Sequence, residues 1–167
     1  MVELKTVSIP STVTSIGNNV FDESYSIEQI NVNSENNNYK SINGVLYDKN
    51  ITTLIQYPVG NSATSYTLPS TVTSLNEIAL KNCHHLQTIE VEEGNTLFKS
   101  KEGVLFDNNM ELLVVYPINR QSKRYYIPEG VKELRKWSIY KSETINEVII
   151  PSTIETINDY SFKGGFG

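Results

Sequence analysis

Only one short cluster in the chain combines residue types that do chemistry. Cys83, His84 and His85 are adjacent, and they include the one cysteine and both histidines of the 167 residues. A cysteine nucleophile needs a base that a third group orients, and a metal site needs further ligands at a defined spacing. Neither partner set is present. Cys83 also falls at a recurring position that Ser24 and Ser142 fill elsewhere, so we predict a buried structural cysteine.

No other pattern indicates catalysis or metal binding. The sequence has no Gly-x-Ser-x-Gly, no His-Glu-x-x-His and no glycine-rich phosphate loop. Asp48 and Asp107 lack the alternating acidic ligands of a calcium loop and are predicted to be turn residues. We therefore predict a protein that is not an enzyme, with no catalytic residue, no metal site and no cofactor.

Composition narrows the class of fold and of partner. Hydrophobic residues make up 38% and charged residues 20%, and the ten Tyr together with abundant Asn, Ser, Thr, Val and Ile favour strands and turns. A formal charge of −5 disfavours nucleic acid. No segment has the roughly 20 apolar residues that span a bilayer. We expect a mostly β protein with no nucleic-acid partner and no membrane insertion.

Internal repetition predicts the fold. Residues 7–65 align without gaps on residues 66–124 with 19 identities in 59 pairs, and a third copy begins at Tyr125. A fixed period of this kind is typical of a solenoid. We predict a single repeat-solenoid domain over residues 1–167, with repeat units 7–65, 66–124 and 125–163.

Each 59-residue unit divides into a 23-residue turn and a 36-residue turn, since 23 + 36 = 59. An aliphatic residue followed by Pro marks the start of a turn at Ile9, Leu68, Ile127 and Ile150. Apolar residues then recur 4, 7, 12, 18 and 21 residues later and predict a shared core. We call these the core positions: Val13, Ile16, Phe21, Ile27 and Ile30; Val72, Leu75, Leu80, Leu86 and Ile89; Val131, Leu134, Ile139, Ile145 and Val148; Ile154, Ile157 and Phe162.

Local patterns predict the elements of each turn. Alternating apolar residues close each 23-residue turn and predict a strand of a parallel ladder. The segment 17–23 is long enough for a short helical or 3-10 turn. In the long turns, two apolar runs flank Asp48-Lys49-Asn50 and its equivalent Asp107-Asn108-Asn109, which predicts one β-hairpin in each. Repeated aromatics such as Tyr57 and Tyr116 are expected to be packing residues.

The run Leu68-Pro69-x-x-Val72-x-x-Leu75-x-x-x-Ala79-Leu80-x-x-Cys83-x-x-Leu86-x-x-Ile89-x-Val91 resembles the BspA-type leucine-rich repeat. Residues 9–32 and the segment 39–48, with its echo at Phe98, resemble the long variant of the same family in bacteria. The resemblance implies a right-handed leucine-rich-repeat coil with a parallel strand ladder. It also implies a surface or secreted protein that adheres to host matrix, cells or polysaccharide.

Two sets of residues are candidates for ligand binding. In a strand ladder the residues between the core positions point outward, and these are Gln29, Asn31, Thr88, Glu90 and Glu147. Arg135, Trp137 and Tyr140 form the second set, an aromatic and basic patch where the earlier copies have other residue types. The alternative interpretation of the second set is an ordinary solvent-exposed face that binds no ligand.

These observations predict an adhesion or interaction module, with a protein or polysaccharide ligand, in a larger cell-surface or extracellular bacterial protein. No signal peptide precedes the first turn in this sequence, so a cytoplasmic protein is the alternative location. The alternative functions are a structural spacer in a multidomain surface protein and an accessory domain attached to a hydrolase. The fourth turn lacks its closing strand before Gly164-Gly165-Phe166-Gly167, so we also expect part of a longer array or end-to-end self-association.

Overall fold

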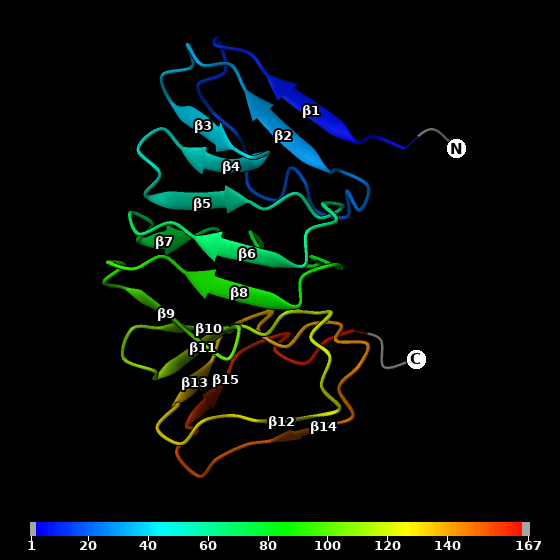
Figure 1. Cartoon of the computed structure of the whole chain (residues 1–167), viewed down its shortest axis with the longest axis vertical. Helices are drawn as coiled ribbons and strands as arrows, with labels where there is room; N and C mark the ends of the chain where they lie inside the picture. Colours follow the sequence, from blue (N-terminus) through cyan, green and yellow to red (C-terminus); the bar gives the residue numbers. More distant parts are fainter. Residues whose placement is uncertain (1–2, 165–167) are drawn as a thin grey trace. The chain divides into compact units, whose positions relative to one another are not determined.

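The computed structural model describes residues 3–164, and these residues form β-strands joined by turns. Figure 1 shows the strands as arrows without any coiled ribbon. The strands are short because each turn of the coil contributes only a few residues to each side. The fold is the predicted β-solenoid of the leucine-rich-repeat type, with parallel strand ladders.

The chain folds into two compact units that interleave in sequence. Unit 1 contains Met1–Ser62 and Thr71–Cys83, and unit 2 contains Ala63–Ser70 and His84–Gly167. The described part of unit 1 begins at residue 3, and that of unit 2 ends at residue 164. The prediction of one domain over residues 1–167 stays a prediction, and its ends at residues 1–2 and 165–167 lie outside the described residues.

Unit 1 has two sheets. In the first, β1 (Thr6–Ile9) pairs in parallel with β2 (Gln29–Val32). The second has the order β3-β4-β5-β7, in which β3 (Tyr39–Ile42), β4 (Val45–Asp48) and β5 (Thr53–Gln56) are antiparallel neighbours. The last strand, β7 (Ser74–Leu75), pairs in parallel with β5.

Unit 2 repeats this plan. Two parallel pairs join β6 (Ser65–Leu68) to β8 (Thr88–Val91) and β12 (Arg124–Tyr126) to β14 (Glu147–Ile149). The other sheet has the order β15-β13-β11-β10-β9. Its strands are β15 (Thr156–Ile157), β13 (Glu133–Leu134), β11 (Leu112–Val115), β10 (Val104–Asp107) and β9 (Phe98–Lys101).

Strand register confirms the predicted short turn. Thr6 pairs with Gln29, Ser65 with Thr88, and Arg124 with Glu147, and the partners of each pair are separated in sequence by the length of one such turn. The same spacing pairs Glu133 of β13 with Thr156 of β15. One turn of the coil therefore returns the backbone to the same position on the next rung of the ladder.

The core positions are buried in the middle turns. Val72 and Leu134 have exposed fractions of 1% and 0%, and a continuous cluster in unit 2 packs Val131, Leu134 and Ile139 around Phe106. The repeated aromatics pack as predicted, since Tyr57 and Tyr116 are both buried. Leu75 and Val148 are only half-buried, and Ile157, which occupies the same position as Leu134, is 49% exposed. The last turn has no further turn stacked on it among the described residues.

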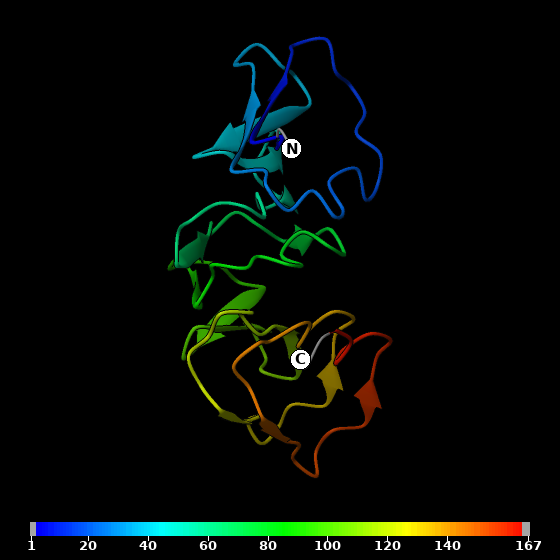
Figure 2. The same cartoon turned by 90° about the vertical axis from the view of Figure 1, so that its right-hand side faces the viewer.

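The predicted helical or 3-10 turn is wrong. Residues 17–23 and their equivalents form hydrogen-bonded turns, in which Asp22 N–H donates to Asn19 O at 3.1 Å and Ser24 N–H to Phe21 O at 3.2 Å. Figure 2 shows the segment between β1 and β2 as a loop without a helix. The turns contain residues of positive φ, Asn19 and Glu23, which interrupt a helix.

The predicted hairpins are confirmed, and each has an additional strand. β4 and β5 pair antiparallel around the Asp48 turn, and β10 and β11 pair around Asp107. The sequence analysis did not predict β3 and β9, which extend these hairpins. Asn43 and Gly44 lie between β3 and β4 with φ values of 51° and 78°, as a two-residue type I′ turn requires. The Asn-Gly dipeptide is the signal that identifies this turn.

Candidate functional site

Cys83 has no reactive character. Its side chain is buried, and Sγ lies 3.8 Å from the Lys81 carbonyl oxygen. Burial raises the pKa of the thiol far above its usual range, so the nucleophilic thiolate does not form at neutral pH. The pKa of the neighbouring His84 is lowered, chiefly by burial. The cluster is therefore a structural cysteine beside a neutral imidazole, as the sequence indicated for Cys83.

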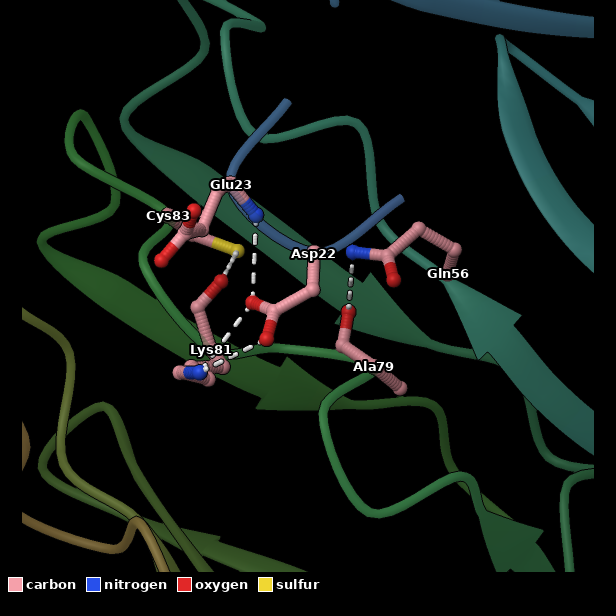
Figure 3. A network of polar contacts seen from close by, with 6 residues as sticks. All are labelled: Asp22, Glu23, Gln56, Ala79, Lys81 and Cys83. Carbon is pink, nitrogen blue, oxygen red and sulfur yellow. Dashed lines mark hydrogen bonds and ion pairs between the residues drawn. The ribbon is translucent and has the colours of Figure 1, made fainter. Parts of the chain in front are cut away.

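A polar network surrounds Cys83 in unit 1 (Figure 3). Lys81 Nζ lies 3.1 Å from Asp22 Oδ1 and 3.3 Å from Oδ2, and the exposed side-chain fractions are 9% and 34%. The amide of Gln56 donates to the Tyr57 and Ala79 carbonyl oxygens at 2.8 and 3.4 Å. Asp22 and Lys81 occupy the same position in successive repeats of the sequence, so their contact ties two equivalent turns together. The ion pair thus has a structural role and lacks the geometry of an acid–base pair at a cavity.

The acidic turn residues are occupied by the backbone. Asp48 Oδ1 accepts from the Thr52 and Thr53 N–H groups at 2.7 and 2.9 Å, and Asp107 accepts from the equivalent N–H groups at 2.8 Å each. Burial alone would raise the pKa of Asp48, but the hydrogen bonds from Thr52 and Thr53 lower it. Among residues 3–164 no three His, Cys, Asp or Glu side chains gather as metal ligands.

The outward strand residues lie in three separate two-stranded sheets. In unit 1, Gln29 and Asn31 lie on β2, and the Asn31 amide is 3.5 Å from Gln29 Oε1. In unit 2, Thr88 and Glu90 lie on β8, whereas Glu147 lies on β14 of a separate sheet. The Glu147 carboxylate pairs with Arg124 on β12.

Hairpin backbones also contact the first residue of two of these strands, although Gln29 is exposed and Thr88 half-buried. A Cβ on Gly44 would lie 3.1 Å from Gln29 Cα, and one on Gly103 would lie 2.8 Å from Thr88 Cγ2. The Gly44 and Gly103 carbonyl oxygens accept from the next strand residue, the N–H groups of Ile30 and Ile89, at 2.9 and 2.8 Å. Gln29 and Thr88 are thus partly occupied by packing within the repeat.

The aromatic and basic patch does assemble, with one more ring than the sequence predicted. The rings of Trp137 and Tyr140 meet edge to face with centroids 5.1 Å apart. Tyr160 stacks on Trp137 with centroids 4.4 Å apart and an interplanar angle of 12°. Tyr160 follows Trp137 by the length of one short turn, so the stack joins consecutive rungs of unit 2.

Three lysines surround these rings. Lys136 Nζ lies 5.8 Å from the Trp137 centroid and 5.4 Å from that of Tyr160. Lys163 Nζ lies 4.7 Å from the Tyr160 centroid, and Lys141 Nζ lies 5.3 Å from that of Tyr140. These distances are in the range of cation–π contacts. We call the six residues the aromatic–lysine cluster: Trp137, Tyr140, Tyr160, Lys136, Lys141 and Lys163.

Arg135 contributes to this surface through its backbone. Its N–H donates to Leu113 O at 3.0 Å, and its carbonyl oxygen accepts from Ser138 N–H at 3.0 Å and from the Ser161 hydroxyl at 3.2 Å. These bonds fix the turn that presents Trp137. Lys136 is the adjacent residue whose cation lies over the rings.

Trp137 and Tyr160 have an unusual backbone conformation for aromatic residues. Their φ values are 65° and 62°, in the left-handed region. Asn19 occupies the equivalent position of the first turn with a φ of 61°. Asn tolerates this conformation, whereas a bulky side chain does so rarely and at some cost. Comparison of each short turn with the next, rather than of each long repeat with the next, is the signal that would have identified Tyr160.

A groove lies in unit 2 at the end of β12, apart from the aromatic–lysine cluster. This groove of about 450 Å³ is lined by Tyr126, Pro128, Ile149 and Pro151 together with charged neighbours. An equivalent groove of about 400 Å³ in unit 1 is lined by Ser8, Pro10, Asn31 and Asn33. The grooves recur with the repeat and differ in polarity, and Tyr126 is 61% exposed in the first of them. Neither holds a cluster of cations and rings.

The described residues contain no helix that is long and apolar enough to cross a membrane. No curated protein gives a match to the chain.

Three solved bacterial structures share the fold. A leucine-rich repeat protein from Eubacterium ventriosum is 20% identical with a TM-score of 0.66, and covers 95% of this chain and 50% of that protein. A leucine rich cell surface protein from Faecalibacterium prausnitzii is 22% identical with a TM-score of 0.65. The match covers 96% of this chain and 39% of that protein. The pneumococcal vaccine antigen PcpA is 23% identical with a TM-score of 0.61. The match covers 92% of this chain and 35% of that protein.

This chain spans half or less of the length of each of these structures. At this level of identity they show the fold alone. The family is shown by the sequence itself, because the model of the BspA type leucine rich repeat region matches residues 1–101 and 57–165, with six copies. With its regular strand register and its repeated core positions, the chain belongs to the BspA-type leucine-rich repeat family.

Proposed function

We propose that this chain is a non-catalytic binding module, with a protein or glycan ligand, of a larger bacterial protein at the cell surface or outside the cell. The observation that carries the proposal is the aromatic–lysine cluster. Where the earlier turns have Asn19 and Asp22, or Ile78 and Lys81, the third copy has Trp137 and Tyr140. A repeat that departs from its own pattern in this way has gained side chains that its core does not require.

The geometry of the cluster supports recognition rather than packing alone. Tyr160 is 45% exposed, and Trp137 and Tyr140 are half-buried, so their rings remain in reach of a ligand. Consecutive turns position them, since Ile139 N–H donates to Ser161 O at 2.9 Å and Lys141 N–H to Lys163 O at 3.2 Å. Rigid aromatic side chains on a fixed scaffold are common anchors of binding sites.

The surface location is supported by two observations. One structurally similar protein is described as a leucine rich cell surface protein, and another as a vaccine antigen. Both are longer than this chain, which is consistent with a module of a larger protein.

A panel of printed glycans and purified extracellular-matrix proteins tests this function with the chain itself. We expect at least one ligand to bind the unaltered chain, and to bind a Trp137→Ala, Tyr140→Ala double variant much more weakly. The matched control is Lys132→Gln, because Lys132 is exposed in the same unit and pairs with Glu111 at 2.8 Å away from the cluster. A spacer, or a domain that serves an attached hydrolase, would bind nothing in a manner that depends on Trp137 and Tyr140, and that result would overturn the proposal.

A further inference from the structure

The aromatic–lysine cluster combines two recognition elements in one small area. Tyr160 is 45% exposed and stacks on Trp137, so the open part of this aromatic surface offers a small apolar platform for the C–H groups of a sugar ring. The ammonium groups of Lys136 and Lys163 lie over the Tyr160 ring, 5.4 and 4.7 Å from its centroid. A ligand that uses both the apolar platform and the ammonium groups has a ring with an apolar face and an attached anionic group.

We propose that the cluster binds a carboxylated sugar, either a uronic acid or a sialic acid residue of a glycan. This inference rests on the proposed function and names the class of its ligand. The pyranose ring packs against the exposed part of Tyr160, and the carboxylate accepts hydrogen bonds from the Lys136 and Lys163 ammonium groups that lie over that ring. Hydrogen bonds between two charged groups are the stronger kind, and they fix the orientation of the sugar.

Local charge favours an anion at this site. Residues 135–141 contain three cations, Arg135, Lys136 and Lys141, and no carboxylate, in a chain whose formal charge is −5. Within the facing segment 159–163, Asp159 and Lys163 cancel. A concentration of positive charge on an acidic protein attracts an anionic group to this place and disfavours its binding elsewhere.

A sugar fits the cluster better than a protein or a nucleic acid. Lysine is depleted from the buried centre of protein interfaces, whereas it makes up half of the six residues here. Single-stranded nucleic acids need a basic groove that follows several nucleotides and rings on which bases stack. Trp137 and Tyr160 are already stacked at 4.4 Å, so no base inserts between them.

The backbone conformation at Trp137 and Tyr160 is unfavourable for aromatic residues. Trp137 and Tyr160 both have φ values above 60°, at a position that Asn19 fills in the first turn. Bulky side chains in this conformation are strained, and Ile51 and Met110 adopt it in the hairpin turns as well. An asparagine, as at position 19, adopts this backbone with less strain, so the aromatic residues at 137 and 160 carry a conformational cost that the first turn avoids.

Two pairs of ligands isolate the carboxylate in a calorimetric titration. Trigalacturonic acid is compared with its methyl ester, and 3′-sialyllactose with lactose. We expect the unaltered chain to bind at least one acidic member at least tenfold more tightly than its neutral partner, with an affinity that falls as salt is added. The first pair identifies a uronic acid ligand and the second a sialic acid ligand.

Variants identify the site. The Trp137→Asn variant removes the ring but places there a residue that readily adopts the left-handed backbone. We therefore expect binding of the acidic sugar to fall at least tenfold. Lys136→Gln keeps the platform and should remove most of the preference for acid over neutral ligand. Lys132→Gln, outside the cluster, should leave both affinities unchanged. Circular dichroism of each variant checks that the fold is kept.

Several results would overturn the inference. Equal affinity for acidic and neutral partners, or no binding of any of the four sugars, excludes the carboxylated-sugar site. If a different glycan or protein from the panel still requires Trp137, the binding function stands and only the carboxylated-sugar assignment is wrong. If polyuridylate requires Trp137 instead, the protein or glycan ligand of the proposed function is wrong as well. If no ligand of any kind depends on Trp137 or Tyr140, the proposed function and this inference both fail.

Discussion

Buried polar side chains stabilise the repeat by hydrogen bonds to the backbone, and Asn36 is the clearest case. Asn36 is fully buried, and its amide donates to the Pro10 and Val13 carbonyl oxygens at 2.9 and 3.0 Å. Its Oδ1 accepts from the Asn38 and Tyr39 N–H groups at 2.8 Å each. A buried polar group is tolerated only when it is satisfied in this way. This residue was not predicted, because the alternation of apolar residues gives no information about buried amides.

Asp48 fixes the β4–β5 turn in a pH-dependent manner. Its folded pKa lies below the usual value, so the stabilisation is fully present above about pH 4, the ordinary pKa of Asp, and is lost as the pH falls through the folded pKa. We expect Asp48→Ala to destabilise the chain by about 1 kcal/mol at neutral pH, as the loss of a helix cap does. The difference from the unaltered chain should shrink in acid.

Urea denaturation at pH 7 and at pH 3 measures this effect. Asp107→Ala removes the equivalent hydrogen bonds in unit 2 and is the matched control for the turn at neutral pH. If the cost of Asp48→Ala were the same at both pH values, its carboxylate would not be the stabilising group.

Trp137 is expected to contribute little to stability. Its stacking contacts are each worth about 0.5–1.5 kcal/mol, whereas its left-handed backbone costs about 1–2 kcal/mol. Trp137→Asn should therefore change the free energy of unfolding by no more than about 1 kcal/mol. Ile139→Ala, two positions further along the chain and fully buried, should cost about 2–5 kcal/mol. Equal losses for the two variants would make Trp137 an ordinary packing residue.

At the scale of the elements, the spacing of apolar residues predicted the ladders because a coil must bring its apolar face back after each turn. The register of β1 with β2 and of β12 with β14 was visible in the sequence for this reason. The turns were mispredicted as helical because their φ values depend on local hydrogen bonds. The cluster was only partly predicted, since the stacking of Tyr160 requires the rungs to be placed in space.

The core positions provide the test of this element-level assignment. Val72→Asp places a carboxylate at a position that is 1% exposed, and burying an unpaired charge costs several kcal/mol. Glu90→Ala changes an exposed residue of β8 and should stay within about 0.5 kcal/mol. Melting temperatures report the difference. Comparable values for the two variants would show that the positions are assigned incorrectly.

The last rung should be the least protected part of its sheet. β15 pairs on one side with β13, and Ile157 is 49% exposed where Leu134 is buried. Short edge strands open locally with a small free energy. We expect the amide hydrogens of β15 to exchange much faster than those of β11 and β13 in a monomeric sample. Equally strong protection at low concentration would show that the edge is covered, and protection that rises with concentration would support end-to-end self-association.

At the scale of the whole molecule, the chain is a repeat scaffold whose third copy departs from the earlier copies at the aromatic–lysine cluster. The repeated residues fill the cores of both units and the turns, and among residues 3–164 no three His, Cys, Asp or Glu side chains gather as metal ligands. The aromatic–lysine cluster is built on two consecutive rungs of unit 2, where repeated positions have exchanged Asn and Asp for rings and lysines. The central claim is that this departure is the ligand site.

The fluorescence of Trp137 tests this claim most directly, because Trp137 is the one tryptophan of the sequence. Its emission reports on the cluster without any label. A ligand whose binding is established by calorimetry should change this emission in a saturable manner, with the same dissociation constant as the calorimetric one. Lys132→Gln should give the same titration curve. A ligand that binds with full stoichiometry and leaves the emission of Trp137 unchanged would contradict the account, because the ligand would then bind elsewhere.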